Sequence, residues 1–398
     1  MKVLVFSSLY PNSVWPHHGV FVKERTVQLT RRGNCEIVVV SPVPYFPTIR
    51  LGRRWHYSQV PRQELQEGIE VYHPCYFMVP KLGMTLYGLS MFLSALPLVR
   101  RLKDHFEFDI IDAHFVYPDG FAAVLLGQFF NKPVVVSARG SDINLYSTFP
   151  VISRLLRFTL LRANRVVTVS RALKDAVIRL GIPEGKIRVI PNGVDQAKFY
   201  PVGKEEARRR LSLPEGKMVL SVGNLTPNKG FDLLIMAFKR LLDSNSHDRP
   251  YLAIVGEGPF RAKLEQLIST LGLHECVRLV GDVQHEHLFL WYGAADIFCL
   301  ASAQEGWPNV ITESLACGTP VVATRAGGIP EIIASDKLGL LSTHDYKELA
   351  SKLSMGLDRE WESHFILSYA KEFSWIKTAE AVYKVLQDAL KTRYSSRE

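Results

Sequence analysis

Short apolar runs alternate with stretches of helical periodicity along the chain. In the first half these runs occupy residues 3–6, 37–40, 109–111, 134–136, 166–169 and 187–190. A second series occupies residues 218–222, 252–255, 277–280, 297–300 and 320–323. Apolar strands separated by helices are typical of parallel sheets that are covered on both faces. The pattern predicts an α/β protein with two doubly wound, Rossmann-like domains.

The two series are separated by the sequence PNGVD, residues 191–195, and by a polar stretch that ends near Gly216. We therefore place one domain at residues 1–195, a second at residues 196–373, and a last helix within residues 374–398. The apolar side chains of this last segment recur at helical spacing, at Trp375, Ala379, Val382, Tyr383 and Leu386. Ligands of doubly wound folds bind at the carboxyl ends of the strands, so we expect a cleft between the domains there.

Residues 82–99 carry no charge and lie between Lys81 and the pair Arg100-Arg101. Their length only just reaches that of a membrane span, and two glycines, two serines and Pro97 weaken that interpretation. The alternation of strands and helices requires one crossover helix here. We expect a packed crossover helix; a helix lying on the membrane surface is the second alternative and a true span the third.

The composition is that of a globular protein. At 398 residues, with 47% apolar and 22% charged residues, the chain is long enough for two full cores. Five cysteines without a C-x-x-C pair argue against a disulfide framework and against a zinc site. The apolar run at residues 3–6 is too short for a secretion signal. We therefore expect a cytoplasmic protein with reduced thiols.

Positive charge is concentrated in the first half of the chain. Residues 1–200 hold 25 Lys and Arg against 14 Asp and Glu, a net charge of +11, whereas the remainder holds 23 against 25, a net charge of −2. Such a surface attracts nucleic acid or anionic lipid. Because no nucleic-acid-binding motif accompanies it, we expect no nucleic acid and favour lipid, at the inner face of the cell membrane, or a phosphorylated acceptor. A basic surface that only aids solubility is the alternative.

The sequence AQEGWPNVITESLACGTPVVATRAGGIPEI, residues 303–332, is the most informative part of the chain. Pro308 suits the first helical position because it has no amide hydrogen to lose there. The amides of Asn309 and Val310 would then open the helix and receive a phosphate group. This arrangement predicts an anion site at the helix N-terminus.

Two carboxylates flank the same helix start. Glu305 precedes it, and the helical rise places Glu313 roughly 7.5 Å from the helix mouth. The pair suits hydroxyl groups at opposite ends of one ligand, with a phosphate between them, which is the shape of a sugar nucleotide. A helix-capping Glu305 and a solvated Glu313 are the alternative.

The motif continues through a helix end of small residues, a turn, a buried strand and the loop Gly327-Gly328. The whole unit resembles the donor-binding signature of the retaining GT-B glycosyltransferases of family four, and the resemblance is strongest at residues 219–331. It implies a GT-B fold, in which the last helix crosses back to the first domain. It also implies that Glu305 binds sugar hydroxyls and that Glu313 binds the ribose.

The second domain offers further candidates in the sequence GNLTPNKG, residues 223–230. Lys229 stands where this loop becomes a helix, and can meet a diphosphate as a point charge; an ordinary exposed lysine is the alternative. The resembled family supplies an arginine and a lysine from this loop, and Asn224 occupies the arginine position here. The resemblance also assigns Gly256 and the backbone of Val283 to the nucleotide pocket.

The sequence SARGSD, residues 137–142, follows a predicted strand of the first domain. Many relatives place a histidine where Arg139 stands. Arg139 could restore the positive charge that Asn224 does not supply, with Asp142 orienting it. A structural ion pair between Arg139 and Asp142 is the alternative.

Two more positions of the first domain follow predicted strands. Gly19 opens a helix, where a glycine lets a diphosphate or an acceptor hydroxyl approach the backbone; a simple turn glycine is the alternative. His114 ends a strand and could contact the acceptor or the sugar, and a buried histidine with satisfied nitrogens is equally compatible with the sequence.

Metal-binding patterns are missing from the sequence. No D-x-D occurs, and His285-Glu286-His287 lacks another ligand at suitable spacing. We therefore expect a reaction that uses neither a metal ion nor a bound cofactor.

The resemblance implies an enzyme that moves a hexose from a UDP- or GDP-sugar to a hydroxyl of a saccharide or lipid-linked acceptor, with retention, in bacterial surface-polysaccharide or glycolipid synthesis. A GT-B-related nucleotide-sugar epimerase is one alternative. A catalytically silent scaffold subunit is another, for which Asn224 leaves room. A dehydrogenase is least favoured because no G-x-G-x-x-G follows the first strand.

Overall fold

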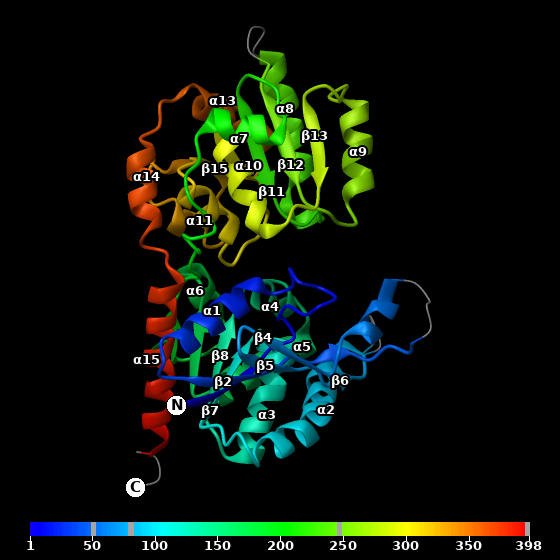
Figure 1. The fold of residues 1–398 in the computed structure, drawn as a ribbon, viewed down its shortest axis with the longest axis vertical. Coiled ribbons are helices and arrows are strands. Elements are labelled where there is room, and N and C mark those ends of the chain that lie inside the picture. The colour runs from blue at the N-terminus through cyan, green and yellow to red at the C-terminus, as the bar shows by residue number, and fades with distance from the viewer. Residues whose placement is uncertain (49–52, 79–82, 245–248, 395–398) are drawn as a thin grey trace. The chain divides into compact units, whose positions relative to one another are not determined.

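The chain forms two compact units (Figure 1). Unit 1 comprises residues 1–192 and 375–398, and unit 2 comprises residues 193–374. Both boundaries fall within three residues of the predicted ones. The structure is a computed structural model that describes residues 1–48, 53–78, 83–244 and 249–394.

Unit 1 is built on a sheet whose described strands run parallel except for β4. Their order is β10 (Ile187–Val189), β9 (Arg165–Thr168), β8 (Val134–Ala138), β7 (Ile110–His114), β1 (Lys2–Phe6), β2 (Glu36–Val40), β5 (Ile69–Tyr72) and β4 (Gln63–Gln66). β1 pairs with β2 on one side and with β7 on the other. From β1 the chain continues to β2, and from β7 it continues to β8 in the opposite direction along the sheet. The loops after β1 and β7 therefore separate at one point of the carboxyl edge, which is where α/β folds bind ligands.

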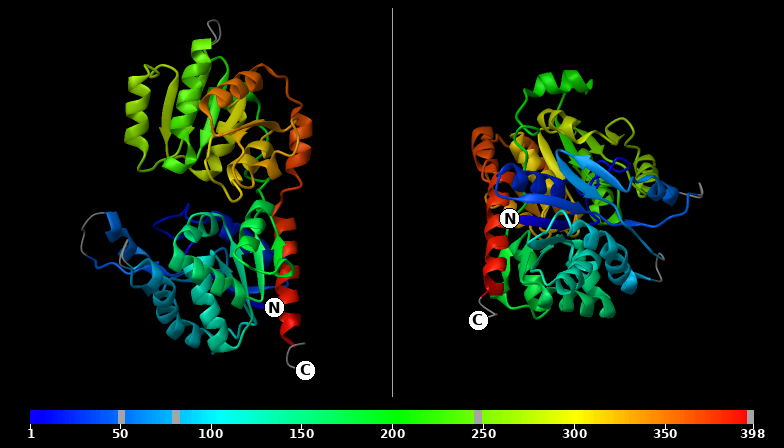
Figure 2. Two further views of the ribbon diagram at one scale, coloured as in Figure 1. Left: turned by 180° about the vertical axis from the view of Figure 1, so that it is seen from behind. Right: turned by 60° about the horizontal axis from the view of Figure 1, so that its bottom comes forward.

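Helices cover both faces of this sheet. α1 (Val20–Arg31) packs against the C-terminal helix α15 (Trp375–Tyr394) on one face. Because the chain returns from β5 across the sheet in the opposite direction, right-handed connections place the next helices on the other face (Figure 2). These are α2 (Tyr87–Leu102), α3 (Phe121–Phe130), α5 (Pro150–Arg162) and α6 (Arg171–Arg179), with the short α4 (Ser141–Asn144) between α3 and α5.

The C-terminal helix is part of the core of unit 1. Val382, Leu386 and Ala389 are fully buried and belong to the same apolar cluster as Val3 and Val5 of β1. The last helix therefore packs on the first domain, as the sequence predicted.

Unit 2 contains a second parallel sheet, in the order β13 (Val277–Gly281), β12 (Tyr251–Val255), β11 (Met218–Val222), β14 (Ile297–Leu300), β15 (Val321–Thr324) and β16 (Gly339–Ser342). Its helices are α7 (Lys204–Leu211), α8 (Phe231–Ser244), α9 (Arg261–Thr270), α10 (Leu288–Ala294), α11 (Asn309–Ala316), α12 (Ile329–Ile332), α13 (Tyr346–Asp358) and α14 (Ser363–Ala370). Phe231 and Phe238 of α8 meet Leu349 and Leu353 of α13 in its core.

The first and last residues of unit 2 lie side by side. The amide of Val194 donates to the carbonyl of Phe373 at 2.9 Å, and Val194 forms a parallel bridge with Ser374. The chain therefore enters and leaves unit 2 at one place.

The predicted apolar runs all correspond to strands, and several short strands were not predicted. These are β3 (Val43–Pro44), which pairs with β6 (Cys75–Tyr76), and β4, β5 and β16. β4 and β5 form a hairpin whose turn residues Glu67 and Gly68 both have positive φ, 50° and 80°. β4 alternates exposed and half-buried residues and β5 alternates buried and half-buried residues, so both lack the continuous apolar run that marks the inner strands.

The uncharged segment at residues 82–99 is the crossover helix that was expected. A 3₁₀ turn, Met84–Leu86, leads into α2, which buries Met91, Ala95 and Val99 within unit 1. Leu82 lies outside the described residues. In the part of the chain that the structure describes, no helix combines the length and the apolarity that a bilayer crossing requires.

Candidate functional site

The loops that follow β11 and β14 touch in unit 2. Gly230 has a left-handed conformation, with φ 66°, and a Cβ there would overlap the carbonyl of Ala301. The amide of Ala303 donates to the carbonyl of Asn228 at 2.9 Å. This contact brings together the two loops that carry Lys229 and Glu305.

Lys229 and Glu305 form an ion pair. Nζ of Lys229 lies 2.6 Å from Oε1 of Glu305, and their side chains are 24% and 10% exposed. A third loop packs against the backbone of Glu305, because a Cβ at Gly327 would overlap the carbonyl oxygen of Glu305. The sequence predicted both residues as ligand contacts, and the structure places them at one point of the carboxyl edge.

Helix α11 begins directly after this loop. It starts at Asn309 with Pro308 as the capping residue, one position later than the sequence predicted. Pro308 has φ −77° and ψ 105°, and so is extended rather than helical. The first-turn residues Asn309 and Val310 are half-buried.

Glu313, on the second turn of α11, is not the solvated residue of the alternative interpretation. It is 6% exposed, and its carboxylate accepts a hydrogen bond from the Tyr292 hydroxyl at 2.9 Å and contacts Nε2 of His285 at 3.1 Å. Burial, followed by the charge of Glu313, raises the pKa of Tyr292 well above its usual value, so Tyr292 stays a donor. The sequence pointed to neither partner of Glu313.

The remaining donor candidates of unit 2 lie in nearby loops. Gly256 has φ 138°, and a Cβ there would overlap the carbonyl of Gly223, so the loops after β11 and β12 pack on each other. Asn224 is exposed beside this contact. Val283 is half-buried in the loop between β13 and His285.

Two buried donors beside Glu305 were not predicted. Ser302 is fully buried and Trp307 is 8% exposed. Among the described residues, neither the Ser302 hydroxyl nor the Trp307 indole nitrogen has a hydrogen-bond partner. Orphaned donors at this depth are uncommon, and each requires a physical explanation.

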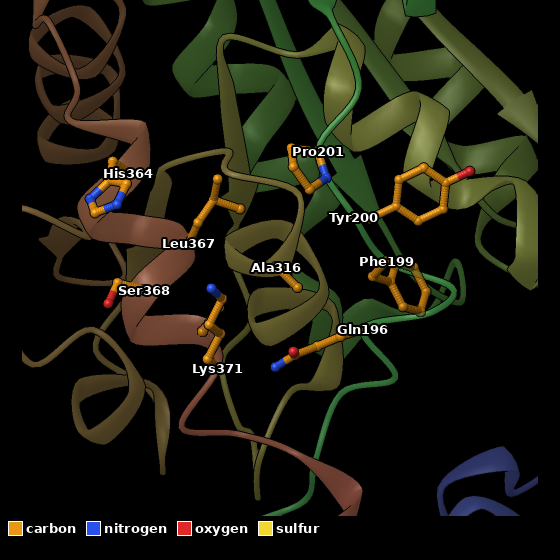
Figure 3. Close-up of a pocket in the computed structure, with 10 residues that line it drawn as sticks. Gln196, Phe199, Tyr200, Pro201, Ala316, His364, Leu367, Ser368 and Lys371 are labelled. Atoms are coloured by element: carbon orange, nitrogen blue, oxygen red, sulfur yellow. The ribbon is translucent and has the colours of Figure 1, made fainter.

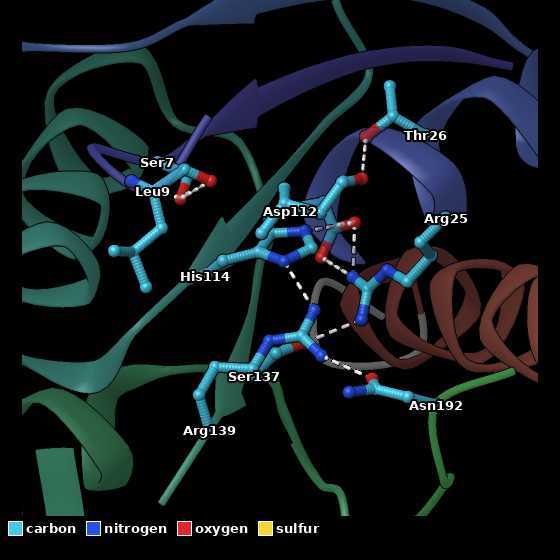
Figure 4. A network of polar contacts seen from close by, with 10 residues as sticks. Ser7, Leu9, Arg25, Thr26, Asp112, His114, Ser137, Arg139 and Asn192 are labelled. Atoms are coloured by element: carbon cyan, nitrogen blue, oxygen red, sulfur yellow. Dashed lines mark hydrogen bonds and ion pairs between the residues drawn. The ribbon is translucent and has the colours of Figure 1, made fainter. Parts of the chain in front are cut away.

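Unit 1 contains a buried charge network at the ends of β7 and β8 (Figure 4). The Arg25 guanidinium, on α1, donates to both carboxylate oxygens of Asp112, at 2.6 and 2.5 Å, and to the Ser137 hydroxyl at 2.9 Å. Burial alone would raise the pKa of Asp112, but the charge of Arg25 and contact with His114 hold it below its usual range.

His114 connects this pair to Arg139. Its Nδ1 accepts a hydrogen bond from the Arg139 guanidinium, so Nε2 carries the proton and faces Asp112 at 3.4 Å. Burial, with the charges of Arg25 and Arg139, lowers the pKa of His114 to about 3, so the ring is neutral. His114 is fully buried, but its Nε2 has no hydrogen-bond partner among the described residues, so it is not the histidine with satisfied nitrogens of the alternative interpretation.

Arg139 is held by its neighbours in unit 1. Its guanidinium donates to Oδ1 of Asn192 at 2.9 Å (Figure 4). It also stacks over Phe21, 5.1 Å from the ring centre. Burial and the charge of Arg25 lower the pKa of Arg139 to about 9, which leaves it protonated at neutral pH.

The expected contact between the side chains of Asp142 and Arg139 is replaced by another. Asp142 accepts hydrogen bonds from the backbone amides of Val116, Arg139 and Gly140, at 2.9, 3.0 and 2.8 Å. Gly140 has φ 132°, a conformation that exposes these amides to the carboxylate. Asp142 therefore fixes the loop, and His114 and Asn192 orient the guanidinium.

Gly19 caps the start of α1 in a left-handed conformation, with φ 71°. A Cβ at this position would overlap the carbonyl group of Leu9, so the loop after β1 folds back onto the helix start. Both the left-handed conformation and this contact require a glycine here.

A separate pocket lies at the opposite end of α11 (Figure 3). It has a volume of about 370 Å³ and lies between α14 and the segment that follows the entry into unit 2. Its walls include Phe199, Tyr200, Ala316, Leu367 and Lys371. In the described part of the chain there is no group of three or more His, Cys, Asp or Glu side chains placed to hold a metal ion.

Comparison with known proteins identifies this arrangement. The profile described as "Glycosyltransferase Family 4" matches residues 19–198, and that described as "Glycosyl transferases group 1" matches residues 203–373. A Bacillus subtilis protein named as the teichuronic acid biosynthesis glycosyltransferase TuaC is 30% identical over 365 residues, covering 89% of this chain and 88% of its own. This chain belongs to the family 4 glycosyltransferases.

Other similar proteins are also glycosyltransferases or share their fold. A D-inositol 3-phosphate glycosyltransferase of Acidothermus cellulolyticus is 34% identical over 245 residues, which is 58% of this chain and 54% of that protein. Two solved structures share the fold over 98% of this chain and 99–100% of their own. They are the sucrose-phosphate synthase of Thermosynechococcus elongatus (TM-score 0.79, 19% identity) and HepE of Anabaena in complex with UDP (TM-score 0.73, 21% identity). The predicted GT-B fold is confirmed.

Proposed function

We propose that this glycosyltransferase transfers a hexose from a UDP- or GDP-sugar to a hydroxyl group of a saccharide or lipid-linked acceptor, with retention of the anomeric configuration. The observation that carries the proposal is the ion pair of Lys229 and Glu305 beside the start of α11. It brings a cation and a carboxylate together beside helix N-terminal amides, and these are the groups that bind a diphosphate and a sugar.

The donor would bind along the loops that follow β11 and β14. Lys229 would meet the diphosphate, and Glu305 would accept hydrogen bonds from sugar hydroxyls. Glu313, positioned by Tyr292 and His285, would bind the ribose. The amides of Asn309 and Val310, together with Gly256 and the backbone of Val283, would complete the nucleotide pocket.

Retention constrains the reaction. It requires either a covalent enzyme intermediate or attack by the acceptor from the face that the diphosphate leaves. No side chain of the motif is placed as a nucleophile by the sequence, which favours the second route. The bond between the anomeric carbon and the phosphate oxygen breaks, the acceptor oxygen bonds to that carbon, and its proton passes to the departing phosphate. Catalysis then depends on positioning and on stabilising the leaving charge.

Unit 1 would supply the acceptor side and one further charge. Arg139 remains protonated and is held by His114 and Asn192, so it suits stabilisation of the leaving diphosphate. Gly19, His114 and Asp142 would support this region, His114 and Asp142 through Arg139 and its loop rather than by direct contact. Arg139 belongs to unit 1 and Asn224 to unit 2.

The acceptor and the place of action are inferred from charge and from relatives. Unit 1 holds 29 Lys and Arg against 16 Asp and Glu, a net charge of +13, whereas unit 2 holds 19 against 23, a net charge of −4. TuaC is named for teichuronic acid biosynthesis, and HepE is described with UDP and with UDP-glucose. We propose a role in bacterial surface polysaccharide or glycolipid synthesis, at the inner face of the membrane.

The test begins with donor binding. Thermal unfolding is measured with UDP-, GDP- and ADP-sugars, because a ligand of the folded state raises the apparent stability. The stabilising donor is then incubated with saccharide and lipid-linked acceptors, and the anomeric configuration of the product is determined by NMR. Conversion of the donor into its isomer without acceptor would instead establish an epimerase. Donor binding without any turnover would support a scaffold role.

A further inference from the structure

The outer helices of unit 1 have an unusual composition. α2, α3 and α5 lie together, since α3 packs against both of the others (Figures 1 and 2). They contain no aspartate, glutamate or lysine. Their charged residues are five exposed arginines: Arg100, Arg101, Arg154, Arg157 and Arg162. These three helices are therefore purely cationic.

Exposed leucines form a stripe along α2 and the 3₁₀ turn before it. Leu86, Leu89 and Leu93 are 62%, 43% and 57% exposed, and their spacing places them on one side of the helix. Phe77, which is 69% exposed, adjoins this leucine stripe because its carbonyl accepts a hydrogen bond from Ser90 of α2. An uncharged stripe thus leads toward Arg100 and Arg101 at the end of the helix.

The other two helices continue the same combination. On α5, the exposed Val151 and Leu161 lie on the side that carries Arg154 and Arg157. At the end of α3, Phe129 is half exposed and the Arg100 guanidinium lies over its ring, 5.3 Å from the centre. Exposed apolar side chains therefore accompany arginines on α2 and α5, and Phe129 of α3 contacts Arg100 of α2.

A water-facing helix layer normally mixes acidic and basic residues, and single exposed leucines need no explanation. Here exposed apolar side chains gather beside arginines with no acidic residue in any of the three helices. Arginine at the border of an apolar surface is favoured at membrane interfaces, where its stem lies on apolar groups and its head binds phosphate. The helix α15, on the other face of the sheet, carries Glu380 and Asp388 and so differs in charge pattern.

We propose that the outer face of α2, α3 and α5 docks on an anionic lipid bilayer. The leucine stripe and Phe77 enter the boundary between headgroups and acyl chains, and the five arginines bind lipid phosphates. This inference deepens the proposed function, since it would bring unit 1 to a lipid-linked acceptor. It assigns the membrane contact to three helices rather than to α2 alone.

The test is co-sedimentation of the full-length protein with vesicles, without donor or acceptor. Vesicles of mixed phosphatidylglycerol and phosphatidylcholine are compared with vesicles of phosphatidylcholine alone. We expect binding to the anionic vesicles and its loss at high salt, because exposed charges are screened. Equal binding to both kinds of vesicle, or to neither, overturns the proposal.

Two double variants locate the contact. Arg154→Glu with Arg157→Glu should weaken binding by about thirtyfold or more, since each cation near an anionic surface contributes about fivefold. Leu89→Ser with Leu93→Ser should weaken it by about tenfold or more, through lost apolar insertion. All four side chains are at least partly exposed, so the fold should be retained, and thermal unfolding checks this.

Matched controls change the same chemistry elsewhere. Leu65, on β4, and Ile376, on α15, are 73% and 62% exposed, and both are changed to serine. Arg209→Glu with Arg210→Glu, on α7 of unit 2, makes the same change in net charge. These controls should bind vesicles like the wild type; losses equal to those of the test variants overturn the assigned face.

The failure of this inference is distinguishable from failure of the proposed function. Vesicle binding with no hexose transfer to any acceptor overturns the transferase proposal and leaves the docking face supported. Hexose transfer to a soluble saccharide, without vesicle binding by the wild type, overturns the docking face and supports the transferase. A protein partner that binds the same helices while vesicles do not also overturns lipid docking.

Discussion

Nζ of Lys229 lies 2.6 Å from Oε1 of Glu305, although 76 positions separate the two residues along the chain. The pair connects the loop after β11 to the loop before α11. Each side chain therefore sets the position and the effective charge of the other, and substitution of one acts on both. This coupling shapes the predictions for the donor site.

Replacing Lys229 by alanine should lower kcat/KM. The expected loss of transition-state stabilisation is about 2 to 4 kcal/mol, the usual cost of removing one preorganised electrostatic donor. Lys229→Arg should recover only part of this, because a planar guanidinium does not replace a compact ammonium. Steady-state kinetics with the identified donor measure both. Lys263→Ala, on α9, is the matched control. If both Lys229 variants keep the wild-type kcat/KM, the diphosphate does not bind at this loop.

Glu305→Ala should abolish turnover and leave the fold intact, since the carboxylate lies in a loop and carries little of the core. Gln304→Ala, the exposed neighbour in the same loop, should remain active. Circular dichroism and a transfer assay on both proteins test this expectation. Near-normal transfer by Glu305→Ala would exclude Glu305 from the site.

Arg139 and Asn224 should be energetically coupled if both face the leaving diphosphate. Arg139→His should be strongly impaired, even though many relatives carry histidine there, because this chain lacks the arginine at position 224. Adding Asn224→Arg should restore part of the loss. The measurement is kcat/KM for the wild type, the two single variants and the double variant.

A structural effect must be separated from this coupling. Arg139 also contacts His114 and Asn192, so Arg139→His will change stability as well as charge. Thermal unfolding of all four proteins measures that contribution. Strict additivity of the kinetic effects would show that the two positions do not share the phosphate.

EDTA should leave the transfer rate largely unchanged. The expectation rests on the sequence, which contains no D-x-D, and on Lys229 and Arg139 as substitutes for a metal's charge. Activity is measured before and after chelation and dialysis. Complete loss, restored by magnesium or manganese, would contradict it.

The contribution of His114 to the stability of unit 1 should decrease as the pH falls below about 6.5. The pKa of His114 is lowered from 6.5 to about 3 on folding, so between these values the unfolded chain binds a proton that the folded chain does not. The free energy of unfolding should then fall by up to about 1.4 kcal/mol per pH unit from this group. Hydrogen exchange of the β7 amides, corrected for intrinsic rates, measures it. His114→Asn should show a shallower dependence; an identical slope would contradict the buried neutral ring.

The sequence predicted the inner strands because each is a continuous apolar run. It did not predict the β4–β5 hairpin, whose strands lie at the sheet edge and whose turn depends on positive φ at Glu67 and Gly68. β16 pairs only with β15 among the described strands and is half-buried at its centre, so it too lacks the pattern of an inner strand.

The candidate site was predictable where its chemistry is local. Glu305 and Glu313 lie in one short motif around a helix start, and Lys229 follows a strand in a loop of recognisable type. The partners of Glu313 were not predictable, because His285 and Tyr292 lie 28 and 21 positions away and meet it only through tertiary packing. The Asp142 interpretation was wrong for a related reason: the sequence gives no sign that the carboxylate turns to backbone amides.

The position of α15 has a consequence for synthesis on the ribosome. Unit 2 is one continuous segment whose ends meet, so it can fold as soon as it has emerged. Unit 1 begins first but needs Val382, Leu386 and Ala389 from the end of the chain to cover Val3 and Val5. The nascent N-terminal sheet therefore keeps part of one apolar face open until α15 has been synthesised. During that interval it is a natural substrate for chaperones.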